Sequence, residues 1–177
     1  MANGPASIFQ IHEKGWSALR DLKVQMLGPE HIAQAYPLVQ AALPEVPLDA
    51  WTDFARALMR HRGRPNSGLL GVVSEQGYLT GLSSYRIARD LLHGRALAAD
   101  HFVAIDLFDR RAVVHALADA IEALAREEQC HAVHTTLQER GSLSGPAGTM
   151  STLAGRGHQV ESVCLCKILP LADQEQE

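Results

Sequence analysis

Apolar residues recur along the chain at two spacings, and each spacing predicts one kind of element. Residues 24–27 form a short apolar run that a Gly-Pro pair ends, as at the end of a strand. Over residues 32–43 and again over residues 51–59, apolar side chains recur every three or four positions, which is the spacing of one face of a helix. We therefore expect a strand followed by two amphipathic helices, divided by a proline-flanked break at residues 44–47.

Three apolar segments follow and predict antiparallel strands. Residues 68–74 and 78–87 flank a short polar connection that ends in Gly77, where a positive φ would suit a tight turn. Residues 96–105 form a third apolar segment after a charged connection. We expect these three segments to pair with one another in sequence order.

The second half of the chain contains the most regular helical pattern. Over residues 110–128 the apolar positions follow heptad-like steps, which predicts a long helix. A buried strand over residues 131–137, a helical turn or short helix over residues 150–153 and a final strand over residues 159–169 complete the order β-α-α-β-β-β-α-β-α-β. The expected fold class is α/β, of the α+β kind, with a mixed, mostly antiparallel central sheet flanked by helices.

The two ends of the chain lack such periodicity. Residues 1–22 mix glycine, proline, serine and scattered charge, with a short helix expected only near residues 16–22. We therefore expect an N-terminal extension over residues 1–22, one domain over residues 23–170 and a polar tail over residues 171–177. A chain of 177 residues with 46% hydrophobic content is suited to one domain with its own core.

Charge and cysteine content narrow the class of partner and the compartment. The 16 basic and 20 acidic residues are interspersed and give a net charge of -4, which argues against binding nucleic acid or an anionic membrane by bulk charge. No apolar run reaches membrane-spanning length, and the N-terminus lacks a signal-peptide pattern. Cys130, Cys164 and Cys166 do not form a disulfide framework, and the last two are expected to fill the core face of the final strand. We expect a cytoplasmic protein that binds a small molecule or another protein.

The predicted order of elements over about residues 23–169 resembles that of the GNAT superfamily of N-acetyltransferases. Two local sequences add to the resemblance: Phe-Val-Ala-Ile at residues 102–105 resembles the family's central strand, and Leu-Ala-Gly-Arg-Gly-His at residues 153–158 resembles its aromatic-x-x-x-Gly-Phe ending. The resemblance implies that acetyl-CoA is the cosubstrate and that a small-molecule or peptide amine accepts the acyl group. A homodimer would be consistent with it.

The resemblance also implies where the cosubstrate would bind. The family holds the pyrophosphate against a loop of the type Arg/Gln-x-x-Gly-x-Gly/Ala, where free N–H groups at the start of the long helix attract an anion. Residues 106–115 contain no glycine, so either Arg110 and Arg111 grip the phosphates with their guanidinium groups or they are solvated charges at a helix start. The resemblance also implies that the amide-like arm of acetyl-CoA pairs with strand backbone near Ala104 and Ile105. The residues implied for the pyrophosphate end are Arg110, Arg111, Ala112, Val113 and Val114.

Catalytic residues are harder to assign. The position that matches the family's proton-donating tyrosine is Leu153, which has no proton to donate. Asp100 and His101 lie on the predicted central strand, where a base could activate an amine through water, and histidine has the more suitable pKa. His101 is the catalytic candidate, with a structural or surface role as the alternative. The absent glycines and Leu153 favour a second hypothesis, a non-catalytic ligand-sensing or protein-interaction module on the same fold.

Two other groups of residues have alternative interpretations. Cys130, His131 and His134 are residue types that bind zinc, but on one strand Cys130 and His134 would lie roughly 13 Å apart while His131 faces the other side. We therefore expect no metal site. The aromatic and sulfur-containing side chains of the second helix are expected either to line a substrate pocket or to belong to the core; they are Trp51, Phe54 and Met59.

Overall fold

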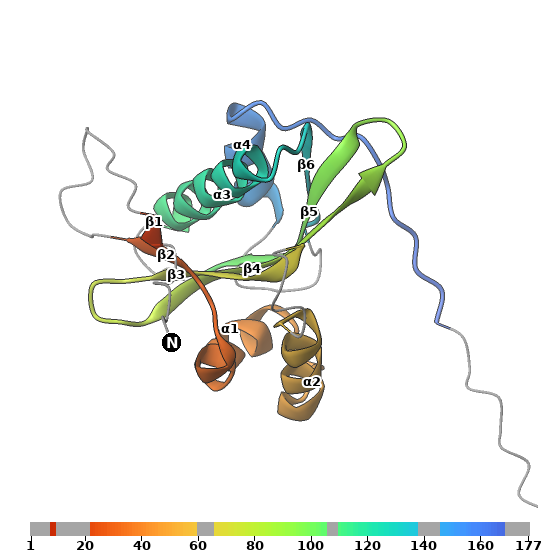
Figure 1. Cartoon of the computed structure of the whole chain (residues 1–177). Coiled ribbons are helices and arrows are strands. Elements are labelled where there is room, and N and C mark those ends of the chain that lie inside the picture. The colour runs from red at the N-terminus through yellow and green to blue at the C-terminus, as the bar shows by residue number, and fades with distance from the viewer. Residues whose placement is uncertain (1–7, 10–21, 60–65, 106–109, 138–145, 169–177) are drawn as a thin grey trace, which may run out of the picture.

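A computed structural model of the protein describes residues 8–9, 22–59, 66–105, 110–137 and 146–168, and these residues form a sheet with helices on both faces (Figure 1). No helix in this part of the chain is long and apolar enough to span a bilayer.

The centre of the sheet is the meander that the sequence predicts. Strands β3 (Ser67–Val73), β4 (Leu79–Asp90) and β5 (Gly94–Ala104) pair antiparallel in sequence order. Gly77 and Gly94 have φ values of 82° and 72°, which glycine adopts without the steric penalty of a Cβ atom. The connections therefore turn where the glycines occur.

Six strands lie in sequence order across the sheet. β2 (Lys23–Met26) lies beside β3, β1 (Ile8–Phe9) lies outside β2, and β6 (Ala132–Thr135) lies on the far side of β5. Only β5 and β6 run parallel, since α3 (Arg110–Glu127) carries the chain back across the sheet between them. The expected mixed, mostly antiparallel sheet is confirmed.

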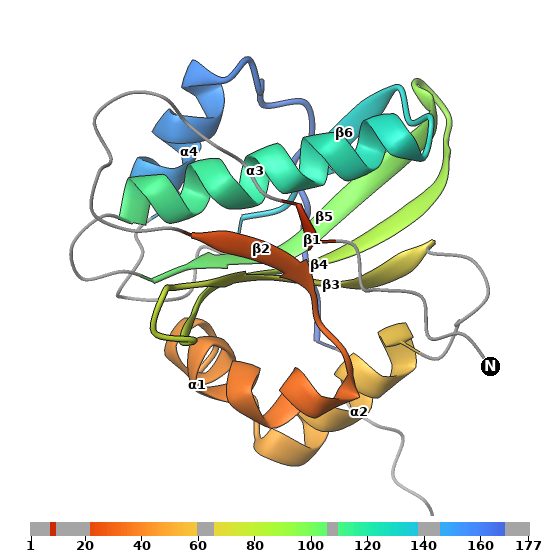
Figure 2. The same cartoon turned by 60° about the vertical axis from the view of Figure 1, so that its left-hand side comes forward.

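Helices form a layer on each face of the sheet (Figure 2). The short helix η1 (Pro29–His31) leads into α1 (Ile32–Ala42), and α1 and α2 (Leu48–Met59) cover one face. α3 and α4 (Pro146–Gly155) cover the other face. Among the described residues the sheet separates two hydrophobic clusters, one under each layer, and β3, β4 and β5 contribute side chains to both.

α3 lies closest to the sheet over Gly81, which supports a test of the packing. A Cβ atom on Gly81 would lie 2.7 Å from Val113 Cγ1 and 2.9 Å from Val72 Cγ2, and both valines are fully buried. Gly81→Ala should therefore lower the free energy of unfolding by about 1–3 kcal/mol, as for other overpacked cores. Urea unfolding measures this change. The control is Gly155→Ala, since a Cβ there would meet nothing within 4 Å; an equal loss in both variants would contradict the packing.

Two segments differ in extent from the sequence-based expectation. Ile8–Phe9, within the predicted N-terminal extension, pair with β2 as an edge strand. The helix expected near residues 16–22 lies outside the described residues except for its last position. α4 has ten residues, more than the helical turn or short helix expected over residues 150–153. The helix begins at Pro146. In the sequence this proline indicated a loop, but proline is also favoured in the first turn of a helix.

The predicted final strand is wrong for residues 159–168, which form no strand and run past the β4–β5 hairpin away from the sheet (Figure 1). Cys164 and Cys166 are exposed instead of filling the core, and Leu165 is 91% exposed. β6 is only four residues long, so it offers few backbone groups to a further strand. An alternating pattern specifies which side chains share a face, but the hydrogen-bonding partner must come from elsewhere.

Candidate functional site

At His101, β5 contains one residue more than the segment of β4 that pairs with it. Asp100 pairs with Ser84 and Val103 pairs with Leu82, so three steps along β5 match two steps along β4. His101 itself has a φ of 52°, which is uncommon for a residue with a Cβ atom. The irregularity is a β-bulge, a feature that redirects side chains and recurs beside functional sites.

The bulge changes the face of the sheet that His101 occupies. Ala99 and Phe102 both belong to the hydrophobic cluster on the α3 side, whereas strict alternation would have placed residue 101 there with Ala99. The ring of His101 instead lies edge-on to Phe54 of α2, with ring centroids 5.0 Å apart. The bulge therefore directs this histidine towards the α2 layer.

The hydroxyl group of Ser84 fixes the ring of His101. Ser84 Oγ donates to the carbonyl oxygen of Asp100 at 3.1 Å and lies 2.9 Å from His101 Nδ1. A hydroxyl has one proton, so with that proton on the Asp100 carbonyl, Ser84 Oγ accepts from the Nδ1–H group of the neutral ring. The lone pair of the imidazole is left on Nε2. This nitrogen can accept a proton from a substrate.

The surroundings also keep His101 uncharged. Burial lowers the pKa of its imidazole below the ordinary value of 6.5, although the negative charge of Asp100 acts in the opposite direction. A neutral imidazole near pH 7 is the form that a general base requires. The partner Ser84 was not predicted from the sequence, where its only signal is a pair of adjacent hydroxyl residues within an apolar strand.

Beyond the bulge, one edge of β5 is open. The ladder with β6 ends at Ala99 and Thr135, and among the described residues no strand lies beside the last part of β5 on that side. The N–H of Ile105 donates to Thr80 O at 2.8 Å, so the backbone groups of Ala104 point the opposite way by the alternation of a strand. Of the two predicted strand residues, Ala104 therefore presents its backbone to the open edge, and the N–H of Ile105 is engaged within the sheet.

The predicted residues at the start of α3 differ in what they can contact. Val113 and Val114 are buried in the core, so only their backbone could meet a ligand. Ala112 is half-buried and Arg111 is exposed. Arg110 is half-buried with its guanidinium against α4, where a Cβ on Gly148 would lie 2.5 Å from its Nη2. Residues 106–109 of the predicted loop lie outside the described residues.

Two other predicted positions belong to the core. Leu153 on α4 is 4% exposed and belongs to the hydrophobic cluster on the α3 side of the sheet. Trp51 is 3% exposed, and its indole N–H donates to Ile32 O at 2.8 Å, so it joins α2 to the start of α1. Of the aromatic residues considered for a pocket, Phe54 alone is in ring contact with His101 among the described residues.

A cavity of about 800 Å³ lies along β6. Its walls are β6, α4 and residues 156–162, and His101 is not among the lining residues. Arg156 forms part of the wall and donates to the carboxylates of Glu122, at 2.9 Å, and of Asp119 on α3. These ion pairs hold the end of α4 against α3.

Comparisons with known proteins concern the fold. No model of a known protein family matches the chain, and neither does any curated protein. A solved aminoglycoside N-acetyltransferase in complex with CoA has a TM-score of 0.65 at 14% identity, over 86% of this chain and 97% of its own.

Two further solved structures show the same likeness. A glucosamine-6-phosphate N-acetyltransferase from Arabidopsis thaliana has a TM-score of 0.61 at 13% identity, over 84% of this chain and 99% of its own. A transcriptional regulator from Bacillus halodurans has a TM-score of 0.66 at 11% identity, over the same shares, 84% and 99%. The chain has the GNAT N-acetyltransferase fold.

Proposed function

We propose that the protein is an N-acyltransferase that transfers an acetyl group from acetyl-CoA to an amine. The observation that carries the proposal is the bulge at His101, where the imidazole lies 2.9 Å from Ser84 Oγ beside the open edge of β5. Similar solved structures include an N-acetyltransferase in complex with CoA, which supports acetyl-CoA as the cosubstrate.

The open edge of β5 would bind the cosubstrate. The amide groups of the CoA arm would pair with the backbone of Ala104, as an added strand would. The first turn of α3 contains no acidic residue, and its helix dipole would favour the pyrophosphate. Arg110 and the exposed Arg111 would bind the phosphates with their positive charge. In the family, backbone N–H groups of a glycine-containing loop make these contacts.

His101 would act as the general base. Its Nε2 would take a proton from the acceptor amine, directly or through one water, while the amine nitrogen forms a bond to the thioester carbon. The C–S bond then breaks and CoA leaves as a thiolate, which solvent protonates, since Leu153 offers no proton. A thiol with an ordinary pKa of about 8.5 is an adequate leaving group without a dedicated acid.

The acceptor would approach from the α2 layer, where Phe54 lies against His101. We propose a small-molecule or peptide amine, in keeping with the aminoglycoside and sugar-phosphate acceptors that the names of similar enzymes state. A homodimer stays a prediction of the family resemblance, and a cytoplasmic location stays a prediction from the cysteine content.

A non-catalytic module on the same fold is the second candidate. Leu153 is buried where the family often has a tyrosine, and residues 106–115 contain no glycine. One of the similar structures is a transcriptional regulator. In this case acetyl-CoA would not be turned over, and a different ligand or a protein would occupy the open edge.

Calorimetric titration with acetyl-CoA separates the two candidates. The wild-type protein should bind acetyl-CoA in the micromolar range, and the double variant Arg110→Ala/Arg111→Ala should bind it at least about tenfold more weakly, because each charged hydrogen bond contributes about 1.5–3 kcal/mol. The control is Arg86→Ala/Arg89→Ala, which removes two exposed charges from β4.

Release of the CoA thiol during a screen of amines then tests turnover. No heat and no thermal stabilisation at millimolar acetyl-CoA would contradict the enzyme and favour the module. Equal weakening in both double variants would contradict a phosphate site at the start of α3.

A further inference from the structure

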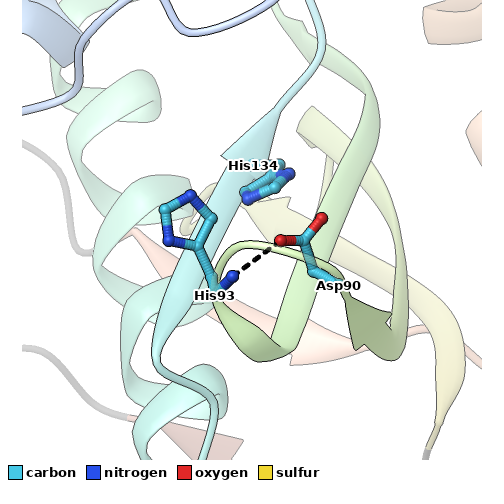
Figure 3. Close-up of side chains that lie close together, drawn as sticks. All are labelled: Asp90, His93 and His134. Carbon is cyan, nitrogen blue, oxygen red and sulfur yellow. Dashed lines mark hydrogen bonds between the residues drawn. The ribbon is translucent and has the colours of Figure 1, made fainter.

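Two histidines and a carboxylate, from the β4–β5 hairpin and from β6, meet at the tip of that hairpin. Asp90 ends β4, His93 lies in the turn and His134 lies on β6. One ligand atom from each lies within 4.8 Å of the other two (Figure 3). In the sequence His134 stands 41 residues after His93, and no local spacing links it to Asp90 and His93.

The turn holds Asp90 in place. Asp90 Oδ1 accepts the backbone N–H groups of Leu92 and His93, both at 2.8 Å, and the second of these bonds is drawn in Figure 3. These bonds shape the hairpin tip and occupy one carboxylate oxygen. They also lower the pKa of Asp90, so the group is a carboxylate at neutral pH. The second oxygen, Oδ2, is the one available to a metal ion.

The two imidazoles lie close together. The rings of His93 and His134 are almost perpendicular, at 88°, with centroids 5.3 Å apart. His134 Nε2 is buried and has no hydrogen-bond partner within the described chain. A buried polar atom without a partner costs about 1–3 kcal/mol, so this nitrogen needs a ligand to be satisfied.

A fourth group comes from the segment that follows α4. Glu161 Oε1 lies 2.6 Å from His93 Nε2, and Glu161 Oε2 lies 3.8 Å from His134 Nε2. Residues 159–168 form no strand, so these contacts hold a segment that has no ladder to fix it. Glu161 would therefore complete a set of two nitrogen and two oxygen ligands.

We propose that Asp90, His93, His134 and Glu161 form a binding site for a zinc-like divalent metal ion. Imidazole nitrogens together with carboxylate oxygens are ligands that Zn²⁺ prefers, whereas Ca²⁺ and Mg²⁺ take oxygen alone. Bonds of about 2.0–2.1 Å in a tetrahedral site put ligand atoms about 3.3 Å apart. The ligand atoms of Asp90, His93 and His134 lie within 4.8 Å of one another. These side chains are half-exposed, so small rotations would bring their ligand atoms to the spacing of a tetrahedral site.

The role of the site is structural. Gly94 at the hairpin tip and His101 are seven residues apart on β5, which spans about 23 Å of extended strand. The metal ion would tie residues 159–168 to the hairpin and to β6 and would close one end of the cavity that His93, His134 and Glu161 help to line. It is independent of the proposed acetyl transfer, because no ligand belongs to that site.

The test is titration of the chelator-treated full chain with Zn²⁺, and with Co²⁺ for its absorption bands. We expect one equivalent of metal with the bands of four-coordinate cobalt, and a rise in the melting temperature with Zn²⁺. His93→Ala/His134→Ala should weaken binding at least about 100-fold and Glu161→Gln about tenfold, in line with the loss of ligands. Zn²⁺ should protect residues 162–168 from proteolysis in the wild type and not in Glu161→Gln.

Two controls identify the ligands. His131→Ala removes an exposed histidine next to the group, and Cys164→Ser/Cys166→Ser removes exposed thiols that bind zinc elsewhere in proteins. Both should bind metal like the wild type. Binding that survives His93→Ala/His134→Ala, binding that is lost in the cysteine variant, or no binding at all would overturn the proposal. None of these results bears on acetyl-CoA binding, so the two proposals fail separately.

Discussion

His101→Asn should lower kcat/KM for acetyl transfer by about 100- to 10,000-fold, the range that general-base catalysis contributes. Asparagine tolerates a positive φ better than most residues, so the bulge, where φ is 52°, should keep its conformation while the base is lost. Steady-state kinetics with the amine found in the screen measures the change. Acetyl-CoA binding should be unchanged, since the cosubstrate would lie along Ala104 and α3.

The pH dependence of the wild-type enzyme provides a second measure of the role of His101. A base is lost when it is protonated, so kcat/KM should fall as the pH falls through the pKa of His101. Burial lowers that pKa, which places the acid limb below 6.5 and leaves kcat/KM independent of His101 above it. The limb should be absent in His101→Asn and present in the control His131→Asn, an exposed histidine. Full activity with an unchanged limb in His101→Asn would rule out this histidine as the base.

Arg156→Ala should lower the free energy of unfolding by about 2–3 kcal/mol. The side chain of Arg156 is only 17% exposed and donates to Glu122 through both Nη2, at 2.9 Å, and Nε, at 3.3 Å, besides its bond to Asp119. Without the guanidinium, two carboxylates on adjacent turns of α3 would face each other partly desolvated, and α4 would lose its attachment. Urea unfolding with a comparison of m-values measures the loss.

The matched control uses the same carboxylate. Arg126 also pairs with Glu122, at 3.0 Å, but its side chain is 74% exposed. Exposed pairs of this kind contribute about 0.3–0.5 kcal/mol, so Arg126→Ala should change the free energy of unfolding by no more than that. Similar losses in Arg126→Ala and Arg156→Ala would show that the attachment of α4 does not depend on the less exposed ion pair.

Much of the fold follows from spacings between residues that are near in sequence. The three-stranded meander and α3 depend on apolar positions two, three or four apart, and their predicted bounds agree with β3, β4, β5 and α3 to within a few residues. The location of the candidate base was also within reach of the sequence, because His101 lies on a strand whose order in the fold could be inferred. Its proton-accepting geometry was not, since Ser84 comes from the neighbouring strand.

The sequence by itself determined the order of most elements and the face that each apolar side chain would occupy within a regular strand or helix. Only the tertiary structure decided three things: the bulge that turns His101 towards α2, the failure of residues 159–168 to pair with β6, and the meeting of Asp90, His93, His134 and Glu161. Each depends on backbone or side-chain partners from segments far apart in the chain. Local periodicity does not contain that information, because it records which residues share a face and not what lies opposite them.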